Sequence, residues 1–110
     1  MVTSIRMAAC VLGCAALGFS APNTGRELFE KHCIACHAKD GSGGHGGANL
    51  RAAMKYGTDV KSVSNVIKHG VPSNGMPSFA DRGPDEIRKI ALYVLQLHKQ
   101  GQADPSKSQK

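Results

Sequence analysis

The sequence predicts an all-α fold built from three main helices. Apolar residues recur at helical spacing in three segments, and each segment opens with residues that favour a helix N-terminus. The sequence shows no run of alternating apolar and polar residues of the kind that marks a half-buried strand. It also contains no internal repeat, so we expect one domain.

The first helix is expected to begin at Thr24 and to run into Cys33. The segment Thr24-Gly25-Arg26-Glu27 has the capping-box pattern, in which the threonine side chain caps the helix and the glutamate reaches back. Leu28 and Phe29 are the apolar residues that this helix would bury.

The second helix is predicted over residues 59–69, with Gly70 as its stop signal. The third opens at Gly83-Pro84-Asp85-Glu86, because proline and acidic residues suit a first helical turn, and it is expected to end before Gly101. The apolar stripes of these two helices are Val60, Val63, Val66 and Ile67, and Ile87, Ile90, Ala91, Val94 and Leu97.

The expected core is thin for a stable domain. Of the 110 residues, about 89 follow the targeting segment described below, and the chain has no Trp, three Phe, two Tyr and 13 Gly. Domains of this size often need a disulfide, a metal or a cofactor. We therefore expect something other than side chains to fill the centre.

The basic charge of the chain does not indicate nucleic-acid binding. The formal net charge is +6, and the Lys and Arg residues are scattered singly without interleaved aromatic residues. Only Arg6 lies in the first 21 residues, so the remainder carries +5. A moderately basic face for an acidic protein partner is the better interpretation.

The N-terminus has the features of a bacterial export signal. Arg6 precedes an apolar stretch at residues 7–17, which is short for a membrane span, and small residues follow at 18–21. We predict a signal peptide at residues 1–21, a folded domain at 22–100 and a disordered polar tail at 101–110, with the mature protein in the periplasm. Val11-Leu12-Gly13-Cys14 also resembles a lipobox, and a lipidated Cys14 would tether the protein to a membrane. An uncleaved anchor is the third alternative.

Two of the four cysteines lie in that targeting segment, which leaves Cys33 and Cys36. They belong to Cys33-Ile34-Ala35-Cys36-His37, the C-x-x-C-H attachment pattern of c-type haem. On a helical turn these positions share one face, so two thiols can bond the haem vinyl groups while the imidazole reaches the iron. A thioredoxin-like pair lacks its βαβ setting, and a zinc site lacks further cysteine ligands. A simple disulfide gives His37 no role.

Two loops between the helices differ in chemistry. The loop at residues 41–47 is rich in glycine, but no strand precedes it and it lacks the Lys-Ser/Thr pair of a phosphate loop. The loop at residues 71–79 presents Met76 between Gly75, expected to allow close backbone approach, and Pro77. A thioether is a soft ligand suited to the sixth position of haem iron. Met54, in a helix-like stretch at residues 51–56 without such a frame, is the weaker candidate.

From residue 24 to residue 99 the chain resembles class I c-type cytochromes, especially short bacterial ones with a single haem. The matching motifs are Gly25…Phe29, Cys33-x-x-Cys36-His37, Ile67…Gly70, Gly75-Met76-Pro77-x-Phe79 and Ile90-x-x-Tyr93-x-x-Gln96-Leu97. The resemblance implies three helices wrapped around one covalent haem c, attached at Cys33 and Cys36, with its iron held by His37 and Met76. It also implies that Gly25 and Phe29 of the first helix cross Tyr93 of the last.

One segment departs from that family. The family usually has a proline before the Asn/Asp-Leu pair that follows the glycine-rich loop, whereas this chain has Gly47-Ala48-Asn49-Leu50. The Ala48 carbonyl can still accept from His37 Nδ1, with less rigid backing. Polar residues after this loop bind the haem propionates in the family, so Arg51 and Tyr56 are candidates for that role or are solvated. His45, His69 and His98 are expected at the surface or behind the ligands.

The function that these features predict is one-electron transfer between redox proteins, a donor and an acceptor such as a dehydrogenase, oxidase or reductase. No catalytic residue is predicted, and the protein is expected to be a monomeric carrier and not an enzyme. Alternatives are a haem subunit of a periplasmic dehydrogenase or oxidase complex, and a five-coordinate gas sensor or weak peroxidase. The docking face is predicted from basic residues near the attachment and ligand segments: Lys31, Lys39, Lys68 and Arg82.

Overall fold

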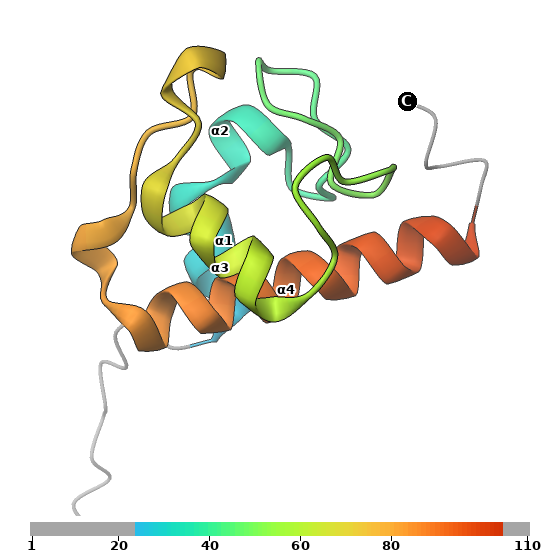
Figure 1. The fold of residues 1–110 in the computed structure, drawn as a ribbon. Coiled ribbons are helices and arrows are strands. Elements are labelled where there is room, and N and C mark those ends of the chain that lie inside the picture. Colours follow the sequence, from blue (N-terminus) through green and yellow to red (C-terminus); the bar gives the residue numbers. More distant parts are fainter. Residues whose placement is uncertain (1–23, 105–110) are drawn as a thin grey trace, which may run out of the picture.

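A computed structural model describes residues 24–104. Within that range the chain has no strand, and one isolated antiparallel bridge pairs Val71 with Met76. The all-α prediction is therefore confirmed (Figure 1). The elements in chain order are the helices α1 (Gly25–His32), α2 (Ile34–His37) and α3 (Val60–His69), the 3₁₀ turns η1 (Pro72–Asn74) and η2 (Ala80–Arg82), and the helix α4 (Pro84–Ala103).

Helix α1 begins where its capping pattern predicted. The Thr24 hydroxyl oxygen accepts a hydrogen bond from the Glu27 backbone N–H at 3.1 Å, and the hydroxyl donates to Glu27 Oε1 at 3.0 Å. The Cys33 N–H bonds to the Phe29 carbonyl at 2.8 Å and closes the helix. The next turn, α2, starts directly after Cys33, so the attachment motif follows α1 without a loop.

Helix α3 also matches its prediction. Asp59 caps it, because its carboxylate accepts from the Ser62 N–H at 2.9 Å and from the Ser62 hydroxyl at 2.7 Å. These hydrogen bonds lower the pKa of Asp59. The helix ends at Gly70, whose φ of 68° lies in the left-handed region that glycine tolerates.

Helix α4 continues past its predicted end. We expected it to stop before Gly101, but it runs to Ala103 with Gly101 buried inside it. A Cβ at this position would collide with the backbone and Cβ of Arg51, so the glycine allows close packing and does not terminate the helix. Gln102 Nε2 donates to the Arg51 carbonyl at 2.9 Å and fixes this last turn. The predicted signal peptide and residues 105–110 of the predicted tail lie outside the described residues.

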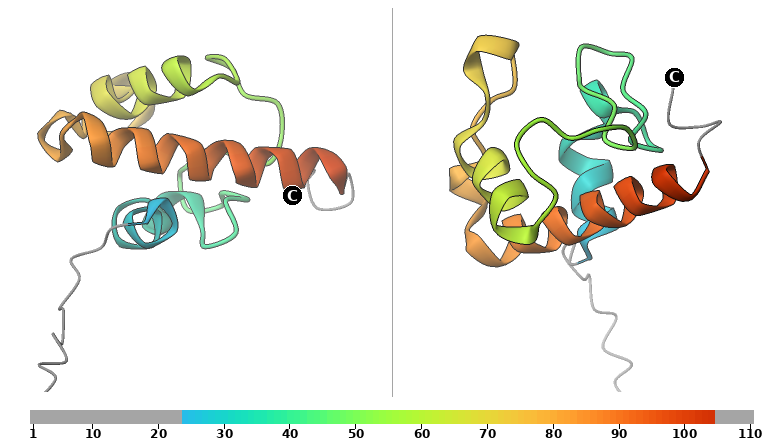
Figure 2. Two further views of the ribbon diagram at one scale, coloured as in Figure 1. Left: turned by 90° about the horizontal axis from the view of Figure 1, so that it is seen from below. Right: turned by 45° about the vertical axis from the view of Figure 1, so that its right-hand side comes forward.

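Helix α4 packs between α1 and α3 and contacts both (Figure 2). The predicted crossing of the first and last helices is present, since the Phe29 and Tyr93 rings lie 5.3 Å apart at 59°. Gly25 allows the close approach there, because a Cβ would collide with the Lys89 carbonyl. The buried apolar cluster that joins the three helices is Leu28, Phe29, Val63, Ile67, Ile87, Ile90, Ala91, Val94 and Leu97.

Candidate haem-binding site

A cavity of about 530 Å³ opens beside the helical core, between α1 and α2 on one side and α3 on the other. Its lining is mainly apolar, and it includes Cys33, Cys36, His37 and Met76. All four residues of the predicted site therefore share one cavity, although about 40 positions separate the last from the others. The volume falls within the ~300–1,000 Å³ that small-molecule and cofactor sites occupy.

The attachment residues are held by the short helix α2. The Cys36 and His37 N–H groups bond to the Cys33 carbonyl at 3.3 and 3.0 Å, which is the helical turn that the motif requires. Both cysteines are free thiols, so the alternative of a disulfide is not realised. Burial, reinforced by the neighbouring Cys36, raises the pKa of the Cys33 thiol to about 11. Both thiols face a common cavity and remain available for covalent attachment.

His37 is oriented by the segment that departs from the family pattern. Its Nδ1 lies 2.8 Å from the Ala48 carbonyl, and because a carbonyl only accepts, Nδ1 is the donor. Nε2 is then the nitrogen that remains for a metal. A Cβ on Gly47 would lie 2.6 Å from the Cys36 carbonyl oxygen and 2.9 Å from His37 Nδ1, so glycine is required here.

The glycine-rich loop at residues 41–47 is hydrogen-bonded to α2, the turn that carries the attachment motif. The Gly43 N–H bonds to the His37 carbonyl at 2.8 Å, and the N–H groups of His45 and Gly47 bond to the Cys36 carbonyl at 3.4 and 3.1 Å. These bonds satisfy carbonyls at the end of α2 that have no helical partner. Sequence analysis excluded a phosphate-binding role for this loop but did not find this one.

Met76 lies in a loop that is closed by its own backbone bridge and is bonded to α3 after Met76. Val71 and Met76 exchange backbone hydrogen bonds of 2.9 and 3.1 Å. Beyond Met76, the Ser78 hydroxyl donates to the Lys68 carbonyl at 2.6 Å, and the Phe79 N–H bonds to the Ile67 carbonyl at 3.0 Å. These hydrogen bonds therefore hold the backbone of Met76 in a fixed position beside the cavity.

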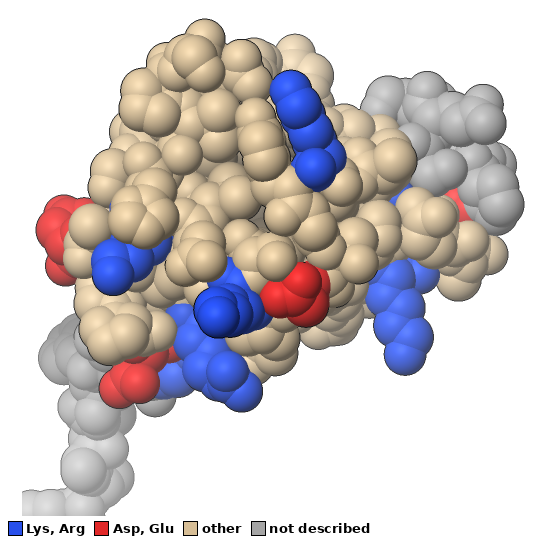
Figure 3. Space-filling model, viewed as in Figure 1, with Lys and Arg blue, Asp and Glu red and all other residues tan. Residues whose placement is uncertain are grey.

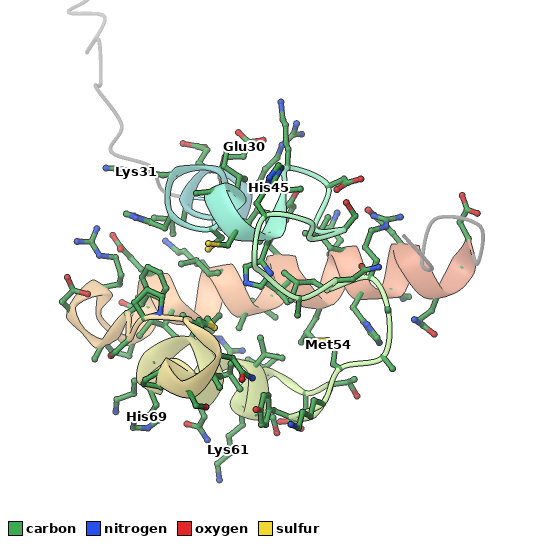
Figure 4. The ribbon with its side chains drawn as sticks, turned by 90° about the horizontal axis from the view of Figure 1, so that it is seen from above. Glu30, Lys31, His45, Met54, Lys61 and His69 are labelled. Carbon is green, nitrogen blue, oxygen red and sulfur yellow. The ribbon has the colours of Figure 1, made fainter. Side chains whose placement is uncertain are left out.

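Two details of the ligand loops correct the expectations. Gly75 has a φ of 83° and its missing Cβ would meet nothing, so it serves a left-handed turn and not a close approach. Gly70 makes the close approach, because a Cβ there would lie 2.6 Å from the Met76 and Pro77 carbonyl oxygens. Residues 51–56, expected to be helix-like, form turns and coil, and Met54 lines the same cavity as Met76 (Figure 4).

His32, which was not among the predicted site residues, lines the cavity one residue before Cys33. Its Nε2 lies 3.3 Å from Arg82 Nη1, and its ring lies 6.4 Å from that of Phe79. Burial, followed by the positive charge of Arg82, lowers the pKa of His32. The neutral ring accepts from Arg82 and so joins α1 to η2, the turn that follows the Met76 loop. The only sequence signal was a polar residue at the buried edge of an amphipathic helix.

The remaining candidates divide between the cavity and the surface. Tyr56 lines the cavity and is 47% exposed, whereas Arg51 lines a separate groove, so of the two propionate candidates the structure brings only Tyr56 to the cavity. His45 and His69 are exposed (Figure 4), as expected. His98 is partly buried, with Nδ1 3.2 Å from the Leu50 carbonyl.

None of the residues of the predicted basic docking face (Lys31, Lys39, Lys68 and Arg82) lines the cavity, although Arg82 contacts His32, which does. Among the described Lys and Arg residues, Lys55 lines the cavity, while Lys39 lines the groove near Arg51 and Lys31 points away from α3 (Figure 4). Charged side chains are sparse on the upper part of the face in Figure 3, where the 71–77 and glycine-rich loops lie. The surface near the cavity is therefore mostly uncharged.

The donor set of the cavity fits a covalently held haem. Two free thiols and an oriented imidazole lie on one turn, a thioether lies on another wall, and the rest of the lining is apolar. Within residues 24–104 no group of three or more His, Cys, Asp or Glu residues could hold a metal ion. No helix in that range is long and apolar enough to cross a membrane.

Comparison with known proteins gives the same assignment. Residues 20–94 match the family described as cytochrome c oxidase, cbb3-type, subunit III. The chain is 32% identical to cytochrome c6 of Cyanidium caldarium over 74 residues, which cover 64% of this chain and 66% of the relative. It is 37% identical to cytochrome c55X of Paracoccus denitrificans over 71 residues, 64% of this chain and 68% of the relative.

A third relative is much longer than this chain. The cbb3-type cytochrome c oxidase subunit CcoP of Cereibacter sphaeroides is 35% identical over 77 residues, which cover 64% of this chain but 25% of the relative. No solved structure matches the chain significantly. Its motifs, its helical fold and these matches place the chain in the cbb3-type subunit III family of cytochromes c, as a small electron-transfer protein with covalently bound haem c.

Proposed function

We propose that this cytochrome is a periplasmic carrier of single electrons whose iron is held by His37 and Met76. The observation that carries the ligand assignment is that both residues line one cavity from backbone-anchored segments. His37 is fixed by the Ala48 carbonyl, and Met76 is fixed by its bridge to Val71. Rigid ligands keep the structural change between oxidation states small.

Met76 is a better candidate ligand than Met54 because hydrogen bonds to α3 hold its loop in place. The bonds from the 78–79 segment to α3 hold the Met76 loop, whereas Met54 lies in a segment without regular structure. The haem supplies a ferrous–ferric couple when bound, and methionine ligation raises its potential. The apolar lining that Phe29, Ile67 and Val94 contribute excludes water from the iron, which also favours the reduced state.

The ligand assignment is tested on the purified haem protein. The ferric wild type is expected to show the weak near-infrared band of sulfur-to-iron charge transfer, and Met76→Ala is expected to abolish it. The variant should also have a lower potential and should bind cyanide or carbon monoxide readily. Met54→Ala is the matched control and should retain the band. If Met54→Ala loses it and Met76→Ala does not, the assignment is wrong.

Export and the domain limits belong to the same proposal. A signal peptide at residues 1–21 and a haem domain from residue 22 are supported by the composition of the N-terminal segment and by the start of α1 at Gly25. The domain, expected to end at residue 100, extends through the last turn of α4 to Ala103, and the polar tail follows it. Mass spectrometry of the exported chain is expected to find a first residue near position 21 or 22. A diacylglyceryl group on Cys14 would instead identify a tethered lipoprotein.

Partner binding is proposed to occur at the mostly uncharged face around the cavity. The second candidate is a haem subunit of an oxidase or dehydrogenase complex. The match to a cbb3-type oxidase subunit supports it. Co-purification of the native protein at low and high salt distinguishes the two, because a carrier is recovered alone and a subunit remains with its complex.

A further inference from the structure

A second concave surface lies on the other side of α1 and α4 from the haem cavity. This groove of about 620 Å³ runs between the start of α1, residues 39–40, Arg51 and one face of α4. Ile90 and Val94 of α4 line the haem cavity, whereas Lys89 and Tyr93 line the groove, so the two surfaces use different faces of one helix. The other charged and amide side chains that line the groove are Arg26, Lys39, Asp40, Gln96 and Gln100.

Arg51 forms part of the groove wall, and its guanidinium is poorly satisfied. It is 8% exposed and is the only charged side chain classed as buried within residues 24–104. Nη1 makes one long hydrogen bond of 3.4 Å to the Asp40 carbonyl, and the buried Nε has no partner. A guanidinium has five N–H donors, and an incompletely paired buried charge is unfavourable.

The position of Arg51 is imposed by its backbone. Its carbonyl accepts from Gln102 Nε2 at 2.9 Å, its N–H donates to Asn49 Oδ1 at 2.9 Å, and Gly101 packs directly on it. These contacts fix the backbone and Cβ of Arg51 against the last turn of α4, so the side chain starts from a buried position. Burial of this charge is a property of the fold.

The surroundings of Arg51 are mainly cationic. Asp40 is the only acidic residue of the groove, and its carboxylate already accepts from the Ser42 N–H at 2.9 Å and from the Ser42 hydroxyl at 2.6 Å. Arg26 is paired with Glu30 at 3.1 Å. Lys39 and Lys89 add two further positive charges to the lining. The Ser42 hydrogen bonds, helped by the charge of Arg51, lower the pKa of Asp40, but that carboxylate accepts from Ser42 and not from the guanidinium.

We propose that this groove binds an oxyanion, with free phosphate as its simplest form. Phosphate oxygens accept from a planar guanidinium in pairs, and lysines and amide side chains complete such sites. The bound anion would satisfy N–H groups of Arg51 that the protein leaves open and would neutralise the excess positive charge. Because the groove is separate from the haem cavity, the anion can bind while the electron-transfer face stays free.

The test is a titration of the reduced haem protein with inorganic phosphate, at constant ionic strength maintained with chloride. Amide and Arg51 side-chain signals in ¹H–¹⁵N NMR spectra are expected to shift and saturate, with the changes confined to the lining of the groove, at residues 24–26, 39–42, 51 and 89–100. Arg51→Lys is expected to weaken binding about tenfold or more, because it removes charge-assisted hydrogen bonds. Lys39→Gln is expected to weaken it a few-fold.

Lys61→Gln is the matched control, because Lys61 is exposed on α3 and points away from α1 (Figure 4). It removes the same charge and should leave phosphate binding unchanged. If Arg51→Lys does not fold, the double variant Lys39→Gln/Lys89→Gln is used in its place, since both lysines are on the surface. It should weaken phosphate binding, whereas Lys61→Gln should not. Shifts that do not saturate, or an equal loss in the Lys61 variant, would overturn the proposal.

Discussion

The crossing of α1 with α4 and the two loops that close the haem cavity are stabilised in different ways. At the crossing, Phe29 and Tyr93 fill the space between the helices and Gly25 allows contact, so side chains alone complete the packing. The cavity loops, at residues 41–50 and 70–79, are held mostly by backbone hydrogen bonds to the ends of α2 and α3. Their inner surfaces face a space that no side chain fills.

The difference identifies which part of the protein depends on the cofactor. Apolar surface that lines a large cavity gains little stabilisation until something is bound there. The crossing gains its stabilisation from contacts between residues of the chain itself. We therefore expect changes at Gly25 and Tyr93, which lie at the crossing and outside the cavity lining, to alter stability and leave the haem chemistry intact. Changes at the cavity, including those at Phe29, which belongs to both regions, should affect both.

The largest effect is expected when the cofactor can no longer be attached. The double variant Cys33→Ser/Cys36→Ser should lose haem during acid–acetone extraction and on denaturing gels, and the chain should be largely unfolded because cofactor binding and folding are coupled. Haem staining and far-ultraviolet circular dichroism measure the two effects. His45→Ser, an exposed change in the glycine-rich loop, serves as control. Native helix content in the haem-free double variant would show that the helices do not need the cofactor.

The next largest effect is expected at the crossing. Phe29 is fully buried, so Phe29→Ala should lower the free energy of unfolding by about 3–5 kcal/mol. The control is Leu92→Ala on α4, where the side chain is 46% exposed and a loss below about 1 kcal/mol is expected. Denaturant unfolding of both haem proteins gives the comparison. A smaller loss for Phe29→Ala than for Leu92→Ala would refute the assigned role of the crossing.

A smaller, pH-dependent effect is expected at His32, which joins α1 to the turn after the Met76 loop. Its pKa in the folded state lies below the ordinary value of 6.5, so the unfolded chain binds the proton more readily. Its contribution to stability is complete above pH 6.5 and is lost as the pH falls from there through the folded-state pKa. Asp40 and Asp59 also have lowered pKa values, and their contributions to stability are lost only at lower pH, below about 3.8.

This effect is measured as the difference between the wild type and His32→Gln in urea unfolding at pH 7 and pH 5. Glutamine keeps an acceptor for Arg82 and cannot be protonated. The wild type should lose more stability than the variant between the two pH values. An equal loss would mean that His32 does not act as this link.

The smallest effect is expected from surface charge. Lys55 lines the cavity and Lys39 lies in the groove, so Lys55→Glu should slow electron exchange with an acidic partner more than Lys39→Glu. Because Lys55 is the only Lys or Arg among the described residues that lines the cavity, the wild-type rate should depend only weakly on ionic strength. Stopped-flow measurements of the second-order rate across salt concentrations test this. A steep salt dependence that Lys39→Glu removes would contradict the uncharged docking face.

Much of this protein follows from short-range sequence signals. Thr24 and Asp59 cap their helices because each side chain reaches a backbone N–H three residues later, an interaction that depends on local spacing alone. The attachment motif is equally local, since one helical turn suffices to place Cys33, Cys36 and His37 on one face. The apolar stripes of α3 and α4 were predictable for the same reason.

The tertiary structure decided everything that depends on approach between distant segments. The end of α4 could not be predicted, because Gly101 serves contact with Arg51, about fifty residues earlier in the chain, and not a turn. Arg51 was placed near the haem by resemblance and Lys39 by its proximity in sequence to the attachment motif, yet both line the other groove, where Arg51 packs against Gly101 of α4. His32 gains its role only through Arg82, fifty positions away. Such contacts arise from the path of the whole chain, for which neither periodicity nor capping patterns carry information.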